Sequence, residues 1–251
     1  TYTYKAVAGG VALYRYKGNT TKPDLVIPDQ ADGIKVVELM DFCAANAQYL
    51  KTIKIGANVE RIATWAFTNC PALEKFEVAR ENRFFETDEN GVLYTTGKKE
   101  LVFYPNARVK LNKDAGEKVT GGGAYEVPAS VTKIRDNAFY LCANLYTITF
   151  NEGLEEIGDA AFMKCSSLQN FVLPQSLTTI GRDGFSFCDS LTTVTIPSNV
   201  KKIGDFGFYS KASAIKKITV KRARNKIHCG DDWLPIMKNS GNVKAKVVYE
   251  P

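Results

Sequence analysis

The chain repeats itself every 23 residues, and this period limits its possible folds more than any other feature of the sequence. A step of 23 residues from Ile134 leads to Ile157, Ile180 and Ile203 without a slip. The same step connects further apolar positions, which are Phe139, Phe162, Phe185 and Phe208; Cys142, Cys165 and Cys188; Leu145, Leu168 and Leu191; and Ile148, Phe171 and Val194. A unit this short cannot bury its apolar side alone. We therefore expect a solenoid, in which each unit buries that side against its neighbours.

Two patterns alternate inside each unit. Leu-x-x-Val-x-Ile, from Leu191 to Ile196, ends in apolar positions at period two and is followed by Pro197, which predicts a short strand. Stacked units would pair these strands into a parallel sheet. The segment Ile-Gly-x-x-Ala-Phe, as at Ile157 to Phe162, is predicted to form a short helical or turn segment on the opposite face. Its Phe ring should stack on the ring of the next unit.

The array weakens towards both ends. Earlier copies begin at Ile62 and at Leu39, and the register slips by one residue after Phe208. Between the clean copies, Asn90-Gly91 predicts a hairpin turn and Gly121 to Gly123 a loop. The expected regions are N-terminal capping strands at 1–38, the repeat solenoid at 39–220 with an irregular insert at about 79–125, and a C-terminal cap at 221–251.

The motif Ile-Gly-x-x-Ala-Phe-x-x-Cys-x-x-Leu-x-x-Ile-x-Ile-Pro resembles the BspA-like leucine-rich repeat of bacterial surface and secreted proteins. The resemblance covers Leu39 to about Val220, and the flanking stretches from Val26 to Leu39 and from Asn90 to Pro105 also fit. It implies an α/β fold, a right-handed leucine-rich-repeat solenoid with a parallel β-sheet on one face and short helical or turn segments on the other. It also implies a non-catalytic role in adhesion or recognition at a bacterial surface.

The positions of the cysteines indicate neither a disulfide nor a metal site. Cys70, Cys142, Cys165 and Cys188 share one repeat position between a core Phe and a core Leu, so we expect buried thiols that pack as small hydrophobes and form no disulfide. A structural zinc site would need Cys-x2-4-Cys spacing, which the sequence lacks. Cys43 and Cys229 lie outside this row. We expect no metal and no cofactor.

An enzymatic reading depends on the single histidine, His228, which is next to Cys229. A thiol–imidazole pair needs mutual hydrogen-bond reach and an orienting third group, and adjacent residues rarely aim at one point. No nucleophile elbow or phosphate-binding loop is present in the sequence. We expect a terminal cap closed by Trp233 and no catalytic residues.

Charge is concentrated at one end of the chain. The net charge is +6, but residues 201 to 251 contain 12 Lys and Arg against 4 Asp and Glu. No apolar run approaches the roughly 18 residues that span a membrane. The first residues lack the pattern of a signal peptide. With the resemblance, this leads us to expect an extracellular or cell-surface protein whose signal peptide was removed before residue 1.

Two surfaces are candidates for binding a partner. One is an outward column on the predicted sheet, and the other is the basic C-terminal end. The residues are Lys75, Thr147, Asn170, Thr193 and Lys217 on the column, and Lys216, Lys221, Arg222 and Arg224 at the end. The basic end favours an anionic glycan or an acidic protein, whereas stacking aromatics or a reading helix for specific nucleic-acid binding are lacking.

These observations lead to a recognition or adhesion module, monomeric and not membrane-spanning, that binds a protein or an anionic glycan. A structural spacer without its own ligand is the alternative, because the sheet columns are mostly Thr. Thr suits an exposed strand for packing reasons alone.

Overall fold

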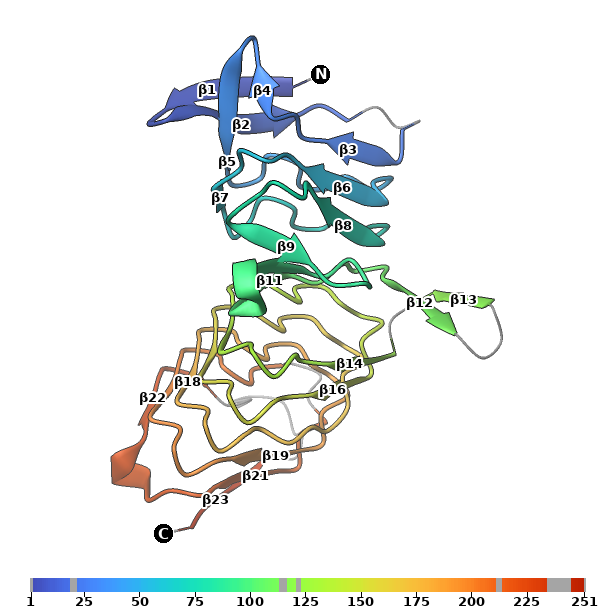
Figure 1. Cartoon of the computed structure of the whole chain (residues 1–251). Coiled ribbons are helices and arrows are strands. Elements are labelled where there is room, and N and C mark those ends of the chain that lie inside the picture. The colour runs from blue at the N-terminus through green and yellow to red at the C-terminus, as the bar shows by residue number, and fades with distance from the viewer. Residues whose placement is uncertain are drawn as a thin grey trace. The chain divides into compact units, whose positions relative to one another are not determined.

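The computed structural model describes residues 2–18, 22–112, 117–120, 123–210, 214–233 and 245–250, with the side chains of 109–120 left aside. The chain forms two compact units, Thr1–Gly121 and Gly122–Pro251. Each is built from short strands, coloured blue to green in the first unit and green to red in the second (Figure 1). We use the word coil for one turn of the repeating chain.

The first unit combines a mixed sheet with the first coils. Its strands are β1 (Tyr2–Val7), β2 (Gly10–Tyr16), β3 (Asp24–Val26), β4 (Gln30–Ala31), β5 (Ile34–Leu39), β6 (Thr52–Ile55), β7 (Arg61–Ile62), β8 (Lys75–Val78), β9 (Phe85–Thr87), β10 (Leu93–Thr95), β11 (Glu100–Phe103), β12 (Val109–Asn112) and β13 (Glu117–Thr120), with a 3₁₀ turn η1 (Thr96–Lys98). Strands β1, β2, β5 and β4 are neighbours in one sheet, and β3, β6 and β8 form a parallel sheet. The predicted hairpin is confirmed, since β9 and β10 pair antiparallel around Gly91, whose φ is 73°.

The second unit stacks its coils through two parallel ladders. Its elements are β14 (Ala124–Glu126), β15 (Lys133–Ile134), β16 (Thr147–Thr149), β17 (Glu156–Ile157), β18 (Thr179–Ile180), β19 (Thr193–Ile196), β20 (Lys202–Ile203), β21 (Lys217–Val220), β22 (His228–Cys229), β23 (Lys246–Tyr249) and a 3₁₀ turn η2 (Arg224–Lys226). The first ladder contains the pair β14–β16 and the sheet β19–β21–β23. The second ladder runs β15–β17–β18–β20–β22 and joins Ile134 to Ile157, Ile180 and Ile203 in register.

The expectation of an α/β fold is wrong, because the described residues contain no α-helix and the architecture is an all-β solenoid. The segments expected to be short helices are chains of tight turns. One or two residues in each coil have left-handed backbone angles, as at Ala160 (φ 52°) and Lys164 (φ 64°). An α-helix cannot pass through a left-handed residue, so each helical turn is cut short. The second ladder is not predicted by the sequence pattern, because its strands are only two residues long in each coil.

Backbone amides in these turns alternate between their own coil and the next. Cys165 N donates to Phe162 O of the same coil at 3.2 Å, whereas Phe162 N donates to Gly184 O of the following coil at 2.8 Å. Lys164 N likewise donates to Ser186 O at 2.8 Å. The turn segments are therefore bonded from coil to coil almost as strands are, although they lack strand geometry.

The interior of the second unit is a row of stacked aromatic rings. Phe162 lies between Phe139 and Phe185, with ring centroids 4.6 and 5.0 Å away, and Phe185 lies 5.2 Å from Phe208. These four side chains are at most 1% exposed. The predicted stacking of one ring per coil is confirmed.

Candidate functional site

Most of the sheet column predicted to bind a partner is exposed on the first ladder of the second unit. Thr193 pairs with Lys217 on the neighbouring strand, and Lys217 pairs with Lys246. Thr147 lies on β16 and is also exposed. Sequence reasoning missed Lys246 because the step from Lys217 to Lys246 is 29 residues rather than 23. The structure thus places two lysines side by side at the end of this column.

Asn170 belongs to the same column, but its side chain already has a structural role. Its Oδ1 atom accepts hydrogen bonds from the backbone amides of Thr192 at 3.0 Å and Thr193 at 3.1 Å. The chain around Asn170 is not a strand, so this amide group takes the place of a ladder hydrogen bond. Asn170 therefore connects two coils.

Lys75, the member of the column in the first unit, is engaged in an ion pair. It lies on β8 and contacts Glu77, which also pairs with Lys54 at 3.2 Å. The hydrogen bond from Lys75 is the main reason that the pKa of Glu77 lies below its ordinary value. A partner that bound Lys75 would first have to displace this carboxylate.

The basic C-terminal end is only partly available. Lys216 and Arg224 are exposed. Lys221 contacts Glu250, and Arg222 donates from Nη1 to Ser198 O at 2.7 Å. Lys216 precedes β21, and the other three follow it. Together with Lys217 and Lys246, Lys216 forms the basic cluster, the name used below for these three residues.

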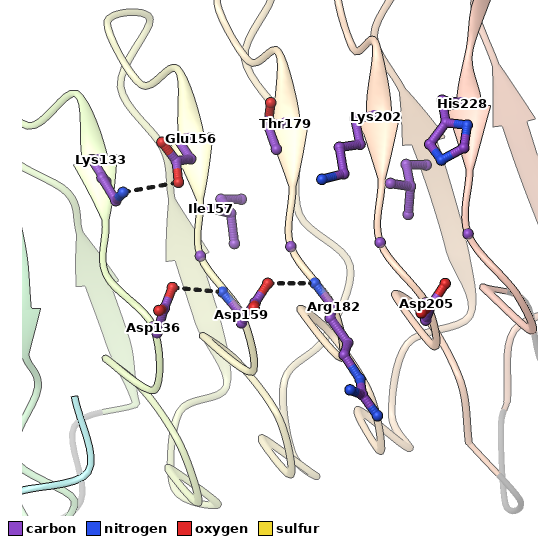
Figure 2. A pocket seen from close by; sticks show the side chains of 15 residues that line it. Lys133, Asp136, Glu156, Ile157, Asp159, Thr179, Arg182, Lys202, Asp205 and His228 are labelled. Carbon is purple, nitrogen blue, oxygen red and sulfur yellow. Dashed lines mark hydrogen bonds and ion pairs between the residues drawn. The ribbon is translucent and has the colours of Figure 1, made fainter. Parts of the chain in front are cut away.

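A groove of about 530 Å³ runs along the second ladder of the second unit. One wall is the row of outward side chains at the first residue of each strand, which are Lys133, Glu156, Thr179, Lys202 and His228. The opposite wall is formed by Asp136, Asp159, Arg182 and Asp205 (Figure 2). The groove crosses several coils, so a bound molecule would have to be polar and elongated.

Glycines form the floor between these walls. A Cβ atom on Gly158 would lie 2.3 Å from Asp136 Oδ1, and one on Gly181 would lie 2.5 Å from Asp159 Oδ1. Only glycine allows this close approach of successive coils. The Ile-Gly step of the motif is thus explained by the packing of one coil on the next.

His228 and Cys229 do not form a thiol–imidazole pair. They are consecutive residues of β22, so their side chains point to opposite faces. His228 lines the groove, whereas Cys229 pairs in register with the interior residue Ile203. Burial raises the pKa of Cys229 to about 11, and an activated nucleophile needs a lowered pKa.

The thiol row lies in the interior, as predicted. Cys70, Cys142, Cys165 and Cys188 are at most 3% exposed, and none of the six cysteines, all within the described chain, is in a disulfide. Cys43 is also buried. Across the described ranges, no group of three or more His, Cys, Asp or Glu is placed to hold a metal ion. No described helix is long and apolar enough to pass through a bilayer.

Stacked coils, parallel ladders and a row of interior rings define the class of protein: a repeat solenoid whose coils bury their apolar side chains against one another. The profile described as "BspA type Leucine rich repeat region" matches six copies at residues 23–106 and 123–229. The chain belongs to this leucine-rich repeat family, as its motif predicted.

Solved structures of bacterial proteins share the fold. The pneumococcal vaccine antigen PcpA is 22% identical, with a TM-score of 0.69 over 84% of this chain and 55% of its own. A leucine rich cell surface protein from Faecalibacterium prausnitzii A2-165 is 22% identical, with a TM-score of 0.62 over 86% of this chain and 63% of its own. A leucine-rich repeat protein from Eubacterium ventriosum is 23% identical, with a TM-score of 0.57 over 84% and 55%.

At this level of identity the likeness concerns the fold alone. The chain covers less than two thirds of the length of each of these three structures. No curated protein matches the chain significantly.

Proposed function

We propose that this chain is a non-enzymatic recognition module of a secreted or surface-attached bacterial protein, and that it binds a protein or an anionic glycan. The fold supports this role because the residues that recur every 23 positions fill the interior, whereas the outward residues of the ladders differ from coil to coil. The names of two structural neighbours, a vaccine antigen and a cell surface protein, support the location.

The observation that carries the proposal is the basic cluster at the end of the first ladder. Lys217 and Lys246 are aligned on adjacent parallel strands, and Lys216 is next to them. Like charges in register destabilise a sheet slightly, so packing does not account for them. An anionic partner would relieve their repulsion and gain affinity from both charges.

The binding surface can be tested with charge reversal. The intact chain and a Lys216→Glu, Lys217→Glu, Lys221→Glu variant are compared for binding to a glycan array and to a panel of extracellular-matrix proteins. A matched control reverses three exposed lysines of the first unit, Lys22, Lys35 and Lys99. We expect binding that the first variant loses and the control keeps. Equal binding by both variants would contradict the assignment.

A structural spacer is the second candidate, and one observation favours it. The exposed strand residues at the middle of the first ladder are the threonines Thr147, Thr149, Thr193 and Thr195, and Val172 between them, 82% exposed, is neither aromatic nor an arginine. A spacer would bind nothing in either screen. That outcome, obtained with folded protein, would replace the recognition role.

A further inference from the structure

A row of aspartates connects the coils along the groove. Asp136 Oδ1 accepts the backbone amide of Asp159 at 2.8 Å, and Asp159 Oδ1 accepts that of Arg182 at 2.7 Å (Figure 2). Asp205 Oδ1 accepts the amide of Asp231 at 2.7 Å. Each carboxylate thus satisfies an N–H group of the coil that follows it.

Arg182 interrupts this row. It stands where the coils on either side have Asp159 and Asp205, and it has no carboxylate to offer. Among the described residues, the backbone amide of Asp205 consequently has no hydrogen-bond acceptor. Such an N–H group is a strong donor, and the equivalent amides on either side of it, those of Arg182 and Asp231, are both paired.

The glycine floor shows the same interruption. A Cβ atom on Gly181 or Gly230 would meet an Asp Oδ1 atom, at 2.5 and 2.2 Å. At Gly204 the nearest atoms belong to the backbone of Arg182 and Gly181, at 2.4 to 2.7 Å, and no carboxylate oxygen is among them. The place beside the glycine that a carboxylate oxygen occupies in the adjacent coils therefore holds no carboxylate oxygen here. We call this space, between Arg182 and Asp205, the carboxylate slot.

Two cationic side chains, Arg182 and Lys202, belong to the two coils that border the carboxylate slot. The Arg182 side chain is 63% exposed, and its one ion pair among the described residues is a 3.5 Å contact with the adjacent Asp183. In Figure 2 this side chain extends away from the Asp205 carboxylate, and its guanidinium carbon lies 5.9 Å from the centre of the Phe206 ring. Lys202 has no ion pair within the described part of the chain, and its ammonium group reaches back towards Thr179.

We infer that the carboxylate slot binds the carboxylate of an acidic sugar, held by the Asp205 amide, Arg182 and Lys202. The contact of Asp159 Oδ1 with the Arg182 amide is the template for this interaction, since the ligand oxygen would occupy the corresponding place one coil later. The inference goes beyond the basic cluster, because the slot lies in the groove of the second ladder, and it rests on the proposed function only for the anionic class of ligand.

The negative charge of the Asp205 carboxylate does not prevent this binding. The Asp205 carboxylate is turned away from the slot, towards the amide of Asp231. The row already contains carboxylates one coil apart at Asp136 and Asp159, so a further carboxylate at this spacing is compatible with the fold. Charge-assisted bonds to Arg182 and Lys202 would offset the repulsion.

The groove favours a sugar over a peptide. Its walls are Lys, Arg, Thr, Asp, Glu and His side chains, its floor is glycine backbone, and the two isoleucines that line it, Ile157 and Ile203, are fully buried. Peptide recognition usually depends on an apolar or aromatic anchor in a pocket, which these residues do not provide. The carboxylates of Glu156 and Asp159 can accept hydrogen bonds from sugar hydroxyls along the groove.

Substitution of Arg182 by Asp gives a direct test, because it fills the slot with the protein's own carboxylate. The probe is galacturonic acid trisaccharide, titrated into ¹⁵N-labelled full chain and followed by the amide signal of Asp205. We expect binding to the unsubstituted chain and a loss of about tenfold or more in Arg182→Asp. Without ligand, the Asp205 amide signal of this variant should move to the position of a hydrogen-bonded amide.

A charge-matched control is Lys164→Asp, an exposed residue outside the groove that should leave the affinity unchanged. Circular dichroism shows that each variant is folded. The neutral galactose trisaccharide should not bind. Undiminished binding by Arg182→Asp, or equal affinity for acetate alone, would overturn the site, and tighter binding of a glutamate-rich peptide would overturn the assignment to a sugar.

The two proposals fail separately. If the uronic acid trisaccharide does not bind but the glycan or matrix screen remains sensitive to Lys216→Glu, Lys217→Glu and Lys221→Glu, the recognition function stands and the carboxylate slot does not. If neither probe nor screen gives binding, both are wrong.

Discussion

The thiol of Cys165 donates a hydrogen bond to the carbonyl oxygen of Phe139, 3.1 Å away in the preceding coil. Cys188 makes the same contact with Phe162, also at 3.1 Å. The repeat position of cysteine is thus explained by two requirements. The side chain must be small and apolar enough for the interior, and it must carry a donor for a buried carbonyl group.

Substitution of Cys165 by Ala should lower the free energy of unfolding by about 1 to 3 kcal/mol, because the sulfur leaves a small cavity and the Phe139 carbonyl loses a donor. Urea denaturation measures the change. Cys229→Ala is the matched control and should change stability less, since Cys229 is half-buried. Equal losses in both variants would show that the coil-to-coil bond has no energetic role.

The buried thiols also predict a loss of stability in alkaline solution. Burial raises the pKa of Cys70 to about 11 and that of Cys43 to about 12, and it holds the pKa of Cys165 and Cys188 well above the ordinary 9.0. Between pH 9.0 and about 11 the unfolded chain therefore loses thiol protons that the folded chain keeps. The stabilisation that the protonated thiols provide is complete below pH 9.0, and it decreases as the pH rises through the thiol pKa values of the folded chain.

This decrease can be measured as the urea midpoint at about pH 8 and at about pH 10.5. Lysines and tyrosines also titrate in this range, so the informative quantity is the difference between the unsubstituted chain and Cys165→Ala. We expect a smaller alkaline loss in the variant. An identical loss would mean that Cys165 does not contribute to the pH dependence.

The repeat period predicted the interior well, because one rule governs every coil. Phe162, Cys165 and Leu168 recur at fixed steps, and their burial follows from stacking alone. The turn segment was misjudged for a local reason. Left-handed angles occur at Ala160, Lys164 and Phe187, residue types that rarely adopt them, and the Asn and Asp that favour them stand at the equivalent position only in some coils, as at Asn137 and Asp183.

The groove shows the opposite limit. Arg182 is visible in the sequence as a departure from the column Asp136, Asp159 and Asp205. The sequence does not show what this departure means, because it matters only once the aspartates are known to accept hydrogen bonds from backbone amides of the following coil. Lys246 was missed because the last coil is longer than the period.

The left-handed angle at Lys164 gives a prediction of increased stability. Its φ is 64°, and a residue with a Cβ atom is strained there by roughly 1 to 2 kcal/mol. Glycine relieves this strain but makes the unfolded chain more flexible, so Lys164→Gly should raise the free energy of unfolding by about 0.5 to 1 kcal/mol. The hydrogen bond from the backbone amide of residue 164 to Ser186 O is unaffected by the change.

Lys201 is the matched control for this substitution, since it is exposed and has no left-handed angle. Lys201→Gly should lower stability by about 0.5 to 1 kcal/mol. Thermal unfolding of both variants gives the comparison. A decrease of the same size at Lys164 would indicate that its backbone angle stores no strain.

Asn170 tests whether a residue on a candidate binding surface serves the fold instead. Its Oδ1 atom is the acceptor for two backbone amides at a point where the first ladder has no strand. Asn170→Ala leaves both amides without this acceptor and should lower the free energy of unfolding by about 1 to 3 kcal/mol. Thr147→Ala, on the same exposed column, should change it by less than about 0.5 kcal/mol. Asn170→Asp keeps an acceptor oxygen and should recover part of the loss in urea denaturation. If Asn170→Ala were as stable as Thr147→Ala, the amide contacts would be dispensable and Asn170 would again be open to a partner.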